Sequence, residues 1–190
     1  AIPDHASDLL SILGGRRAVL IGHSMGGNVV LSVAQQHPEL VASAAVYETP
    51  LTWMPWWPQN STSRTVGNAG EDPGDVAEAF MRGMIGNSRW ERLPDATRQA
   101  RRSEGRVLIG EMVSVREVAP WVGTEIEVPV VVGRGSEARP HHFEGMVRLA
   151  ESIPEGHLVT LDGCHHVAHS AAPDQFVEEV IRPALKRARW

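Results

Sequence analysis

The sequence predicts an α/β protein in which a parallel sheet is flanked by helices. Four short apolar runs, at residues 18–21, 44–47, 128–132 and 158–161, have the length and composition of buried parallel strands. Stretches with helical periodicity separate several of these runs, and strand, helix and strand at this spacing form a βαβ unit. The 190 residues can bury one sizeable core.

Apolar residues three and four positions apart predict the helices of this architecture. The first helix ends at Gly14-Gly15, the next near His37-Pro38, and a third at Ile153-Pro154. A last helix is predicted near the C-terminus, with a kink at Pro183. The periodic positions are Ala6, Leu9, Leu10 and Leu13; Val29, Val30 and Val33; Phe143, Met146, Val147 and Ala150; and Phe176, Val177, Val180 and Ile181.

A different composition occupies residues 51–126, where prolines, glycines and tryptophans accompany amphipathic pieces such as Val76–Met84. This segment has no convincing strand alternation, so we expect a helical insertion rather than a separate domain. The predicted division is a first part of the core at 1–50, the insertion at 51–126, and a second part of the core at 127–190.

The composition argues against several classes of function. A net charge of -5 provides no basic face, so nucleic acid is not expected as a partner. No apolar run approaches the roughly 20 residues that span a bilayer, so no membrane partner is expected. The single cysteine, Cys164, cannot form an internal disulfide, which fits a cytoplasmic location. A homo-oligomer is compatible with these features.

The segment GHSMG, Gly22–Gly26, matches the pattern G-x-S-x-G. An apolar strand precedes it and a helix follows, which is the context in which this pattern marks a nucleophilic serine. Ser24 must then occupy a strained turn that raises its hydroxyl above the sheet, and we expect Gly22 and Gly26 to provide the space. Partial positive charge at the start of the following helix would stabilise an oxyanion.

A serine hydroxyl needs a base to take its proton. The segment LDGCHHVAHSAAPDQF follows the last predicted strand, so it can return to the edge of the sheet at which Ser24 lies. Three histidines in this segment are candidates for the base: His165, His166 and His169.

The segments VLIGHSMGG, VYETP and GCHHVAHSAAPDQF together resemble the α/β-hydrolase superfamily, in particular its esterase, lactonase and haloperoxidase-like members. The resemblance covers nearly the whole chain. It implies that Ser24 is the nucleophile and that His166 is the base, with His169 as the histidine that typically follows three residues later. It also implies that the N–H of Met25 contributes to the oxyanion hole.

The acid that orients the histidine has two candidate positions. The family usually places it shortly after the strand at 128–132, where this sequence has Ser136 at the expected position and Glu137 one residue later. Some members instead use a glutamate at the end of the strand after the nucleophile helix, and Glu48 stands there. Glu48 is the predicted acid and Glu137 the alternative, since both preserve the order serine, acid, histidine.

In the resembling family the insertion is a cap that covers the pocket and selects the substrate. Trp53, Trp56 and Trp57, with His23 beside the nucleophile, are the predicted substrate-binding residues for a small hydrophobic ester or lactone. Histidines also occur at 141–142 and in HHVAH, but no carboxylate or cysteine set completes a metal site at a recognisable spacing. No metal ion or cofactor is expected.

The resemblance also implies further strands before the strand at 18–21, which would otherwise be an exposed apolar edge. We therefore expect an N-terminal polypeptide that completes the sheet, with this chain as one part of a split or processed enzyme. The predicted function is hydrolysis of a carboxylic ester or lactone through an acyl-enzyme. The alternatives are a non-catalytic structural subunit or fragment, a cofactor-free haloperoxidase or perhydrolase, and a C–C bond hydrolase.

Overall fold

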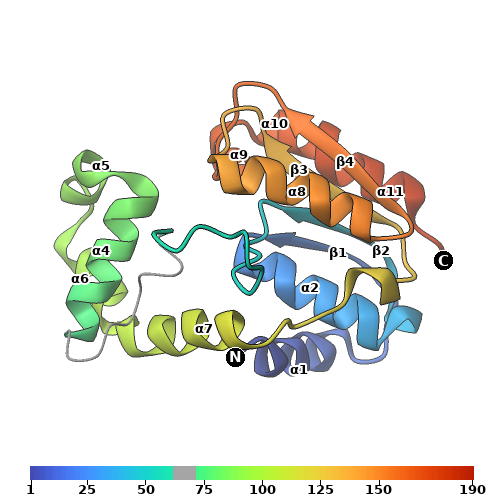
Figure 1. Cartoon of the computed structure of the whole chain (residues 1–190), viewed down its shortest axis with the longest axis horizontal. Helices are drawn as coiled ribbons and strands as arrows, with labels where there is room; N and C mark the ends of the chain where they lie inside the picture. The colour runs from blue at the N-terminus through green and yellow to red at the C-terminus, as the bar shows by residue number, and fades with distance from the viewer. Residues whose placement is uncertain (62–71) are drawn as a thin grey trace. The chain divides into compact units, whose positions relative to one another are not determined.

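The computed structural model describes residues 1–61 and 72–190, and residues 62–71 of the predicted insertion lie outside this range. The described strands form one parallel sheet in the order β1-β2-β3-β4 (Figure 1). These strands are β1 Ala18–His23, β2 Val41–Tyr47, β3 Val130–Gly135 and β4 Gly156–Leu161. The predicted α/β class with a parallel sheet is confirmed.

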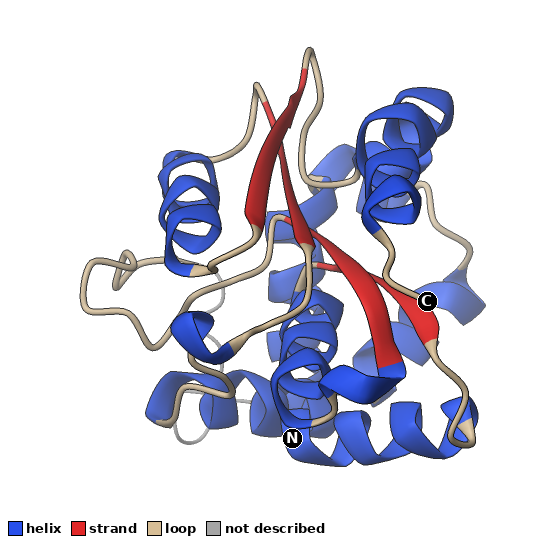
Figure 2. Cartoon of the chain, turned by 90° about the vertical axis from the view of Figure 1, so that its right-hand side faces the viewer, coloured by secondary structure: helices blue, strands red, loops and turns tan. Residues whose placement is uncertain are grey.

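Helices cover both faces of this sheet (Figure 2). Helix α2 (Met25–Gln36) packs against β1 and β2, and α8 (Pro140–Ser152) packs against β3 and β4. Both belong to crossovers between neighbouring parallel strands, which are right-handed and so place their helices on the same face. Helix α1 (Ile2–Leu13) packs on α2.

The opposite face carries a buried apolar cluster. Ala45 and Tyr47 of β2 pack there with side chains from the C-terminal helices, including Phe176 and Val180. The remaining helical elements of this part of the chain are η1 Pro38–Leu40, η2 Gly123–Glu125, α9 Ala168–Ala171, α10 Pro173–Phe176, η3 Val177–Ile181 and α11 Arg182–Arg187. Every residue of β2 is buried, so the strand that directly precedes Glu48 lies in the core.

The observed strands extend beyond the predicted runs at one end, and the predicted start of β3 is wrong. β3 begins at Val130 and not at Val128. Pro129 lies between them and has no N–H with which to pair in a ladder, although its carbonyl accepts the N–H of Ala44 at 2.9 Å. The strand also continues to Gly135, which extends it to the end of the sheet where Glu48 lies.

A π-helical turn precedes Pro183, the position of the predicted kink. This turn, η3, occupies Val177–Ile181 and passes directly into α11 at Arg182. Proline cannot donate the next backbone hydrogen bond, so a local change in helical pitch at this point has a direct cause.

The chain forms two compact units, one of residues 2–51 and 120–190, and one of residue 1 and residues 52–119. The second unit is helical, and no strand occurs among its described residues. Its helices are α4 Pro73–Ile85, α5 Asn87–Glu91, α6 Asp95–Ser103 and α7 Gly105–Glu117.

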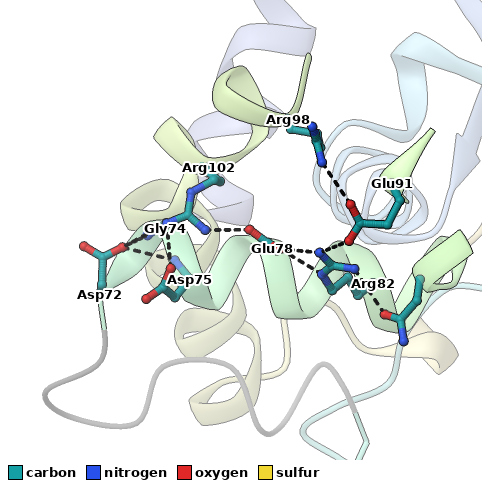
Figure 3. A network of polar contacts seen from close by, with 9 residues as sticks. Asp72, Gly74, Asp75, Glu78, Arg82, Glu91, Arg98 and Arg102 are labelled. Carbon is teal, nitrogen blue, oxygen red and sulfur yellow. Dashed lines mark hydrogen bonds and ion pairs between the residues drawn. The ribbon is translucent and has the colours of Figure 1, made fainter. Parts of the chain in front are cut away.

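A network of ion pairs joins α4, α5 and α6 within the second unit (Figure 3). Arg102 pairs with Asp75 and with Glu78, both at 2.6 Å. Arg82 pairs with Glu78 at 2.6 Å and reaches Glu91 on α5. Exposed ion pairs contribute little one by one, but a shared network fixes the mutual register of short helices that bury little apolar surface.

The described residues contain no helix that is long and apolar enough to cross a membrane.

Candidate active site

The turn at Ser24 joins β1 directly to α2. Ser24 has φ 52° and ψ -128°, a backbone conformation that is rare for a residue with a side chain. Its N–H donates to the Tyr47 carbonyl at 2.9 Å, and its own carbonyl accepts the N–H of Gly27 at 2.9 Å. Such strain costs on the order of 1–3 kcal/mol and concentrates at functional sites, where the surrounding structure maintains it.

The glycines around this turn have different roles from those predicted. A Cβ on Gly22 would lie 2.5 Å from the carbonyl oxygen of Gly26, so Gly22 is required for the close approach of strand and helix. The expectation that Gly26 provides space was wrong, because a Cβ there would meet no atom within 4 Å. Gly27 is the second tight position, since a Cβ there would collide with the Thr49 side chain.

Glu48 and His166 form a hydrogen-bonded pair at the same edge of the sheet. Glu48 directly follows β2, is fully buried, and has a positive φ of 45°. Its Oε1 accepts the N–H of Gly135 at 3.0 Å, and its Oε2 lies 2.9 Å from His166 Nδ1. Because a carboxylate only accepts, Nδ1 carries the proton, and the second ring nitrogen of His166, Nε2, is left as a proton acceptor.

The loop that carries His166 is held by hydrogen bonds from three elements. His23 Nε2 donates to the carbonyl of His166 at 2.7 Å, and the Tyr47 hydroxyl donates to the carbonyl of His165 at 3.1 Å. The N–H of Glu137 donates to the carbonyl of Cys164 at 3.0 Å. Burial, followed by the charge of Glu48, raises the pKa of Tyr47, so its hydroxyl keeps the proton that it donates.

The alternative acid and the alternative base pair with each other. His165 Nε2 lies 3.5 Å from Glu137 Oε2, and both side chains are more than half exposed. Ser136, at the family's usual acid position, accepts the N–H of Gly163 at 2.8 Å through its hydroxyl. The buried pair in this structure is therefore Glu48 with His166, and the exposed pair is Glu137 with His165.

Two further histidines flank the ring of His166. The ring centroid of His23 lies 4.6 Å from that of His166, and the centroid of His142 lies 5.2 Å from it. The ring of His169 packs against His23 at 4.4 Å rather than against His166.

The environment keeps both flanking histidines neutral. Burial lowers the pKa of His23 to about 4, and the neighbouring charge of His166 acts in the same direction. Burial, followed by the charges of His166 and His141, holds the pKa of His142 well below its usual value. Because a carbonyl only accepts, the proton of the neutral His23 ring is on Nε2.

His142 also completes a set of possible metal ligands that the motifs of the sequence did not reveal. One ligand atom each from Glu48, His142 and His166 lie within 4.8 Å of one another. The three residues come from the end of β2, the first turn of α8 and the loop after β4. Motif spacing could not reveal this set because its members are far apart along the chain. The signal that was available is the position of His141-His142 shortly after a strand that ends at the same edge.

The other predicted site residues lie at the start of α2 and in the unit of residues 52–119. Met25 is the first residue of α2, so its N–H is among those without an acceptor inside the helix. Trp53, Trp56 and Trp57 belong to the unit of residues 52–119. Trp57 is buried and donates its indole N–H to Ser61 at 3.1 Å, whereas Trp53 and Trp56 are partly exposed. Substrate binding by these tryptophans stays a prediction.

Asn28 is a buried polar residue that supports the site and was not identified from the sequence. Its Nδ2 donates to the Pro50 carbonyl at 3.0 Å, and its Oδ1 accepts the indole N–H of Trp121 at 3.0 Å. The amide thereby ties α2 to the segment that follows Glu48.

We expect Asn28→Ala to destabilise the protein, because it leaves a buried carbonyl and a buried indole N–H without these bonds. The loss should be about 1–3 kcal/mol for each group that stays unpaired. Urea unfolding measures it as a lower transition midpoint. Glu144→Ala on the exposed side of α8 is the control and should change stability by no more than about 0.5 kcal/mol. Equal midpoints for the two variants would contradict the prediction.

The fold and this site define the class of the protein. A parallel sheet with helices on both faces carries a strained serine between strand and helix, and a buried carboxylate–histidine pair at the same edge. The family model described as the alpha/beta hydrolase family matches residues 1–179. The chain belongs to the alpha/beta hydrolase family.

Solved structures support the same fold. A hydrolase from Pseudomonas aeruginosa superposes with a TM-score of 0.66 at 23% identity, over 91% of this chain and 66% of that one. The enol-lactonase from Burkholderia xenovorans gives a TM-score of 0.67 at 20% identity, over 94% of this chain and 70% of that one. A structure from work on carboxylesterases of Nitrososphaera gargenis gives a TM-score of 0.65 at 18% identity, over 94% of this chain and 69% of that one. The chain thus spans about two thirds of the length of these proteins. A comparison with curated proteins gave no match.

Proposed function

We propose that the chain is the catalytic part of a serine hydrolase that cleaves a carboxylic ester or a lactone through an acyl-enzyme. The observation that carries this proposal is the hydrogen bond between the buried Glu48 and the partly buried His166, near the strained turn of Ser24. The Ser24 turn and the Glu48–His166 pair are linked through His23, the residue before Ser24. His23 donates to the backbone carbonyl of His166 and packs against its ring. Strain, a buried acid and an oriented imidazole at one edge of a sheet are the parts that activate a serine.

In the proposed reaction, the Ser24 hydroxyl attacks the carbonyl carbon while Nε2 of His166 takes its proton. Glu48 stabilises the imidazolium that forms and keeps the ring in the required tautomer. The oxyanion accepts a hydrogen bond from the N–H of Met25 and lies at the positive end of α2. The alcohol leaves with the proton from His166, and water then releases the acid from Ser24 by the same steps in reverse order.

The substrate class is proposed from the chemistry of the site and from the neighbours. Two of the compared structures are described in terms of an enol-lactonase and of carboxylesterases, respectively. A lactone is an internal ester, so the same nucleophile, base and oxyanion donor serve both substrates. The hydrophobic character of the substrate rests on the sequence-based prediction that Trp53, Trp56 and Trp57 bind it.

An active-site probe tests this proposal. A fluorophosphonate reacts with a serine only when a base activates its hydroxyl, and the adduct is stable enough to locate by mass spectrometry of peptides. We expect one adduct per chain, on Ser24, and a labelling rate at least about 100-fold lower for His166→Ala. Heat-denatured protein is the control and should not react. Labelling at another serine would contradict the assignment of Ser24 as the nucleophile. Absence of labelling in the folded protein would contradict the proposal and favour a non-catalytic subunit.

A further inference from the structure

Three metal-binding groups meet at the buried edge of the sheet. Glu48 is fully buried, His142 is 9% exposed, and the side chain of His166 is 18% exposed. One ligand atom from each lies within 4.8 Å of the other two. The hydrolase chemistry proposed above uses Glu48 and His166 but gives no task to His142.

The distances in this group approach those of a coordinated cation. Zinc lies about 2.1 Å from histidine nitrogens and carboxylate oxygens, so neighbouring ligands in a tetrahedral site are roughly 3.4 Å apart. His166 Nδ1 and Glu48 Oε2 are already 2.9 Å apart. The ligand atom of His142 lies no more than 4.8 Å from the other two, so it would have to move inward by up to about 1.4 Å to reach this spacing.

We propose that Glu48, His142 and His166 form a binding site for a zinc-like divalent transition metal ion. Two imidazoles and one carboxylate are a ligand set that binds zinc in proteins, with an open position for water. The ligands come from three elements that the fold already holds together, so little further ordering is needed on binding. The N–H of Gly135 donates to Oε1 of Glu48 and would orient the carboxylate, as hydrogen bonds to metal ligands commonly do.

Occupancy of this site would stop the hydrolase, a consequence that rests on the proposed function. The metal would replace the proton on Nδ1 of His166, and the neutral ring would then carry its proton on Nε2. Nδ1 would be bound to the metal and Nε2 protonated, so the ring could no longer accept a proton from Ser24. The ion is therefore a reversible inhibitor, and His142 is the residue that makes the site able to bind it.

Calorimetric titration with zinc chloride, after removal of metal with a chelator, tests the site directly. The titration uses Ser24→Ala, which retains all three ligands and has no nucleophile. The expected result is one zinc ion bound per chain, with an affinity at least about tenfold weaker when His142→Asn is added. The matched control adds His141→Asn, which removes the adjacent histidine outside the ligand set and should change the affinity by less than about twofold.

Absence of zinc binding, or equal affinities of the His142 and His141 variants, would overturn the proposal. Circular dichroism establishes whether the His142 variant is folded. If it is not, Glu48→Gln supplies the same comparison, because it keeps the size of the side chain and removes the charged ligand.

Measuring inhibition of ester hydrolysis by zinc distinguishes the metal site from the proposed hydrolase function. Zinc should inhibit ester hydrolysis by the chain with its native Ser24, EDTA should restore the rate, and His141→Asn should behave in the same way. Zinc binding without any hydrolase activity would refute the proposed function and leave the metal site standing. Hydrolase activity without zinc binding would refute only the metal site.

Discussion

Ser24→Ala is expected to lower kcat for hydrolysis of a short p-nitrophenyl ester by about 10⁶-fold, equivalent to about 8 kcal/mol of transition-state stabilisation. The loss is large because the variant has no atom that can form the acyl-enzyme, so His166 and Glu48 have no hydroxyl to activate. The remaining rate reflects binding and the N–H groups at the start of α2. Stopped-flow measurement should also show that the burst of acylation is lost.

The control for this variant is Ser170→Ala, which removes an exposed hydroxyl near His169 and should leave kcat within about twofold. Alanine and serine both carry a Cβ, so the positive φ at position 24 is strained to a similar extent in the variant and in the native chain. The two alanine variants should therefore unfold at similar temperatures. Retention of activity by Ser24→Ala would show that another residue is the nucleophile.

The sequence predicts this fold well because the informative patterns are local. Apolar runs of four or five residues mark the four strands, and the β1–Ser24–α2 connection is contained in one continuous segment. The error at β3 also has a local cause, since Val128 extends the apolar run across a proline that cannot pair in a ladder. A prediction from apolar residues alone therefore starts this strand at Val128, two residues too early.

The candidate site could be predicted only in part, because contacts across the fold have no signature along the chain. The resemblance to the α/β-hydrolase family predicts Glu48 and His166, each of which follows a strand that ends at one edge of the sheet. His142 and Asn28 lie on helices that are mostly packing surfaces, and their partners come from distant segments. The role of Gly27 depends on how closely α2 approaches Thr49, which no short pattern encodes.

Glu48→Gln is expected to reduce kcat by about 10⁴-fold with a smaller effect on KM. The glutamine side chain of this variant has nearly the same size and could still accept the N–H of Gly135 through its amide oxygen. The amide nitrogen would then point toward His166 Nδ1, and two donors cannot face each other, so the ring turns or changes tautomer. The base then presents the wrong nitrogen to Ser24, and the imidazolium loses its buried counter-charge.

Glu137→Gln is the matched comparison, because it makes the same chemical change at the alternative acid. We expect its kcat to stay within about twofold of the native value, since Glu137 is more than half exposed and its partner is His165. A double variant that combines Glu137→Gln with His165→Asn should show no further loss of kcat. If Glu137→Gln instead loses activity while Glu48→Gln retains it, the acid is Glu137, and the loop at 162–167 must rearrange during catalysis to bring His166 to it. Losses of equal size in both variants would point to a shared network, which the double variant would reveal as a loss smaller than the product of the two.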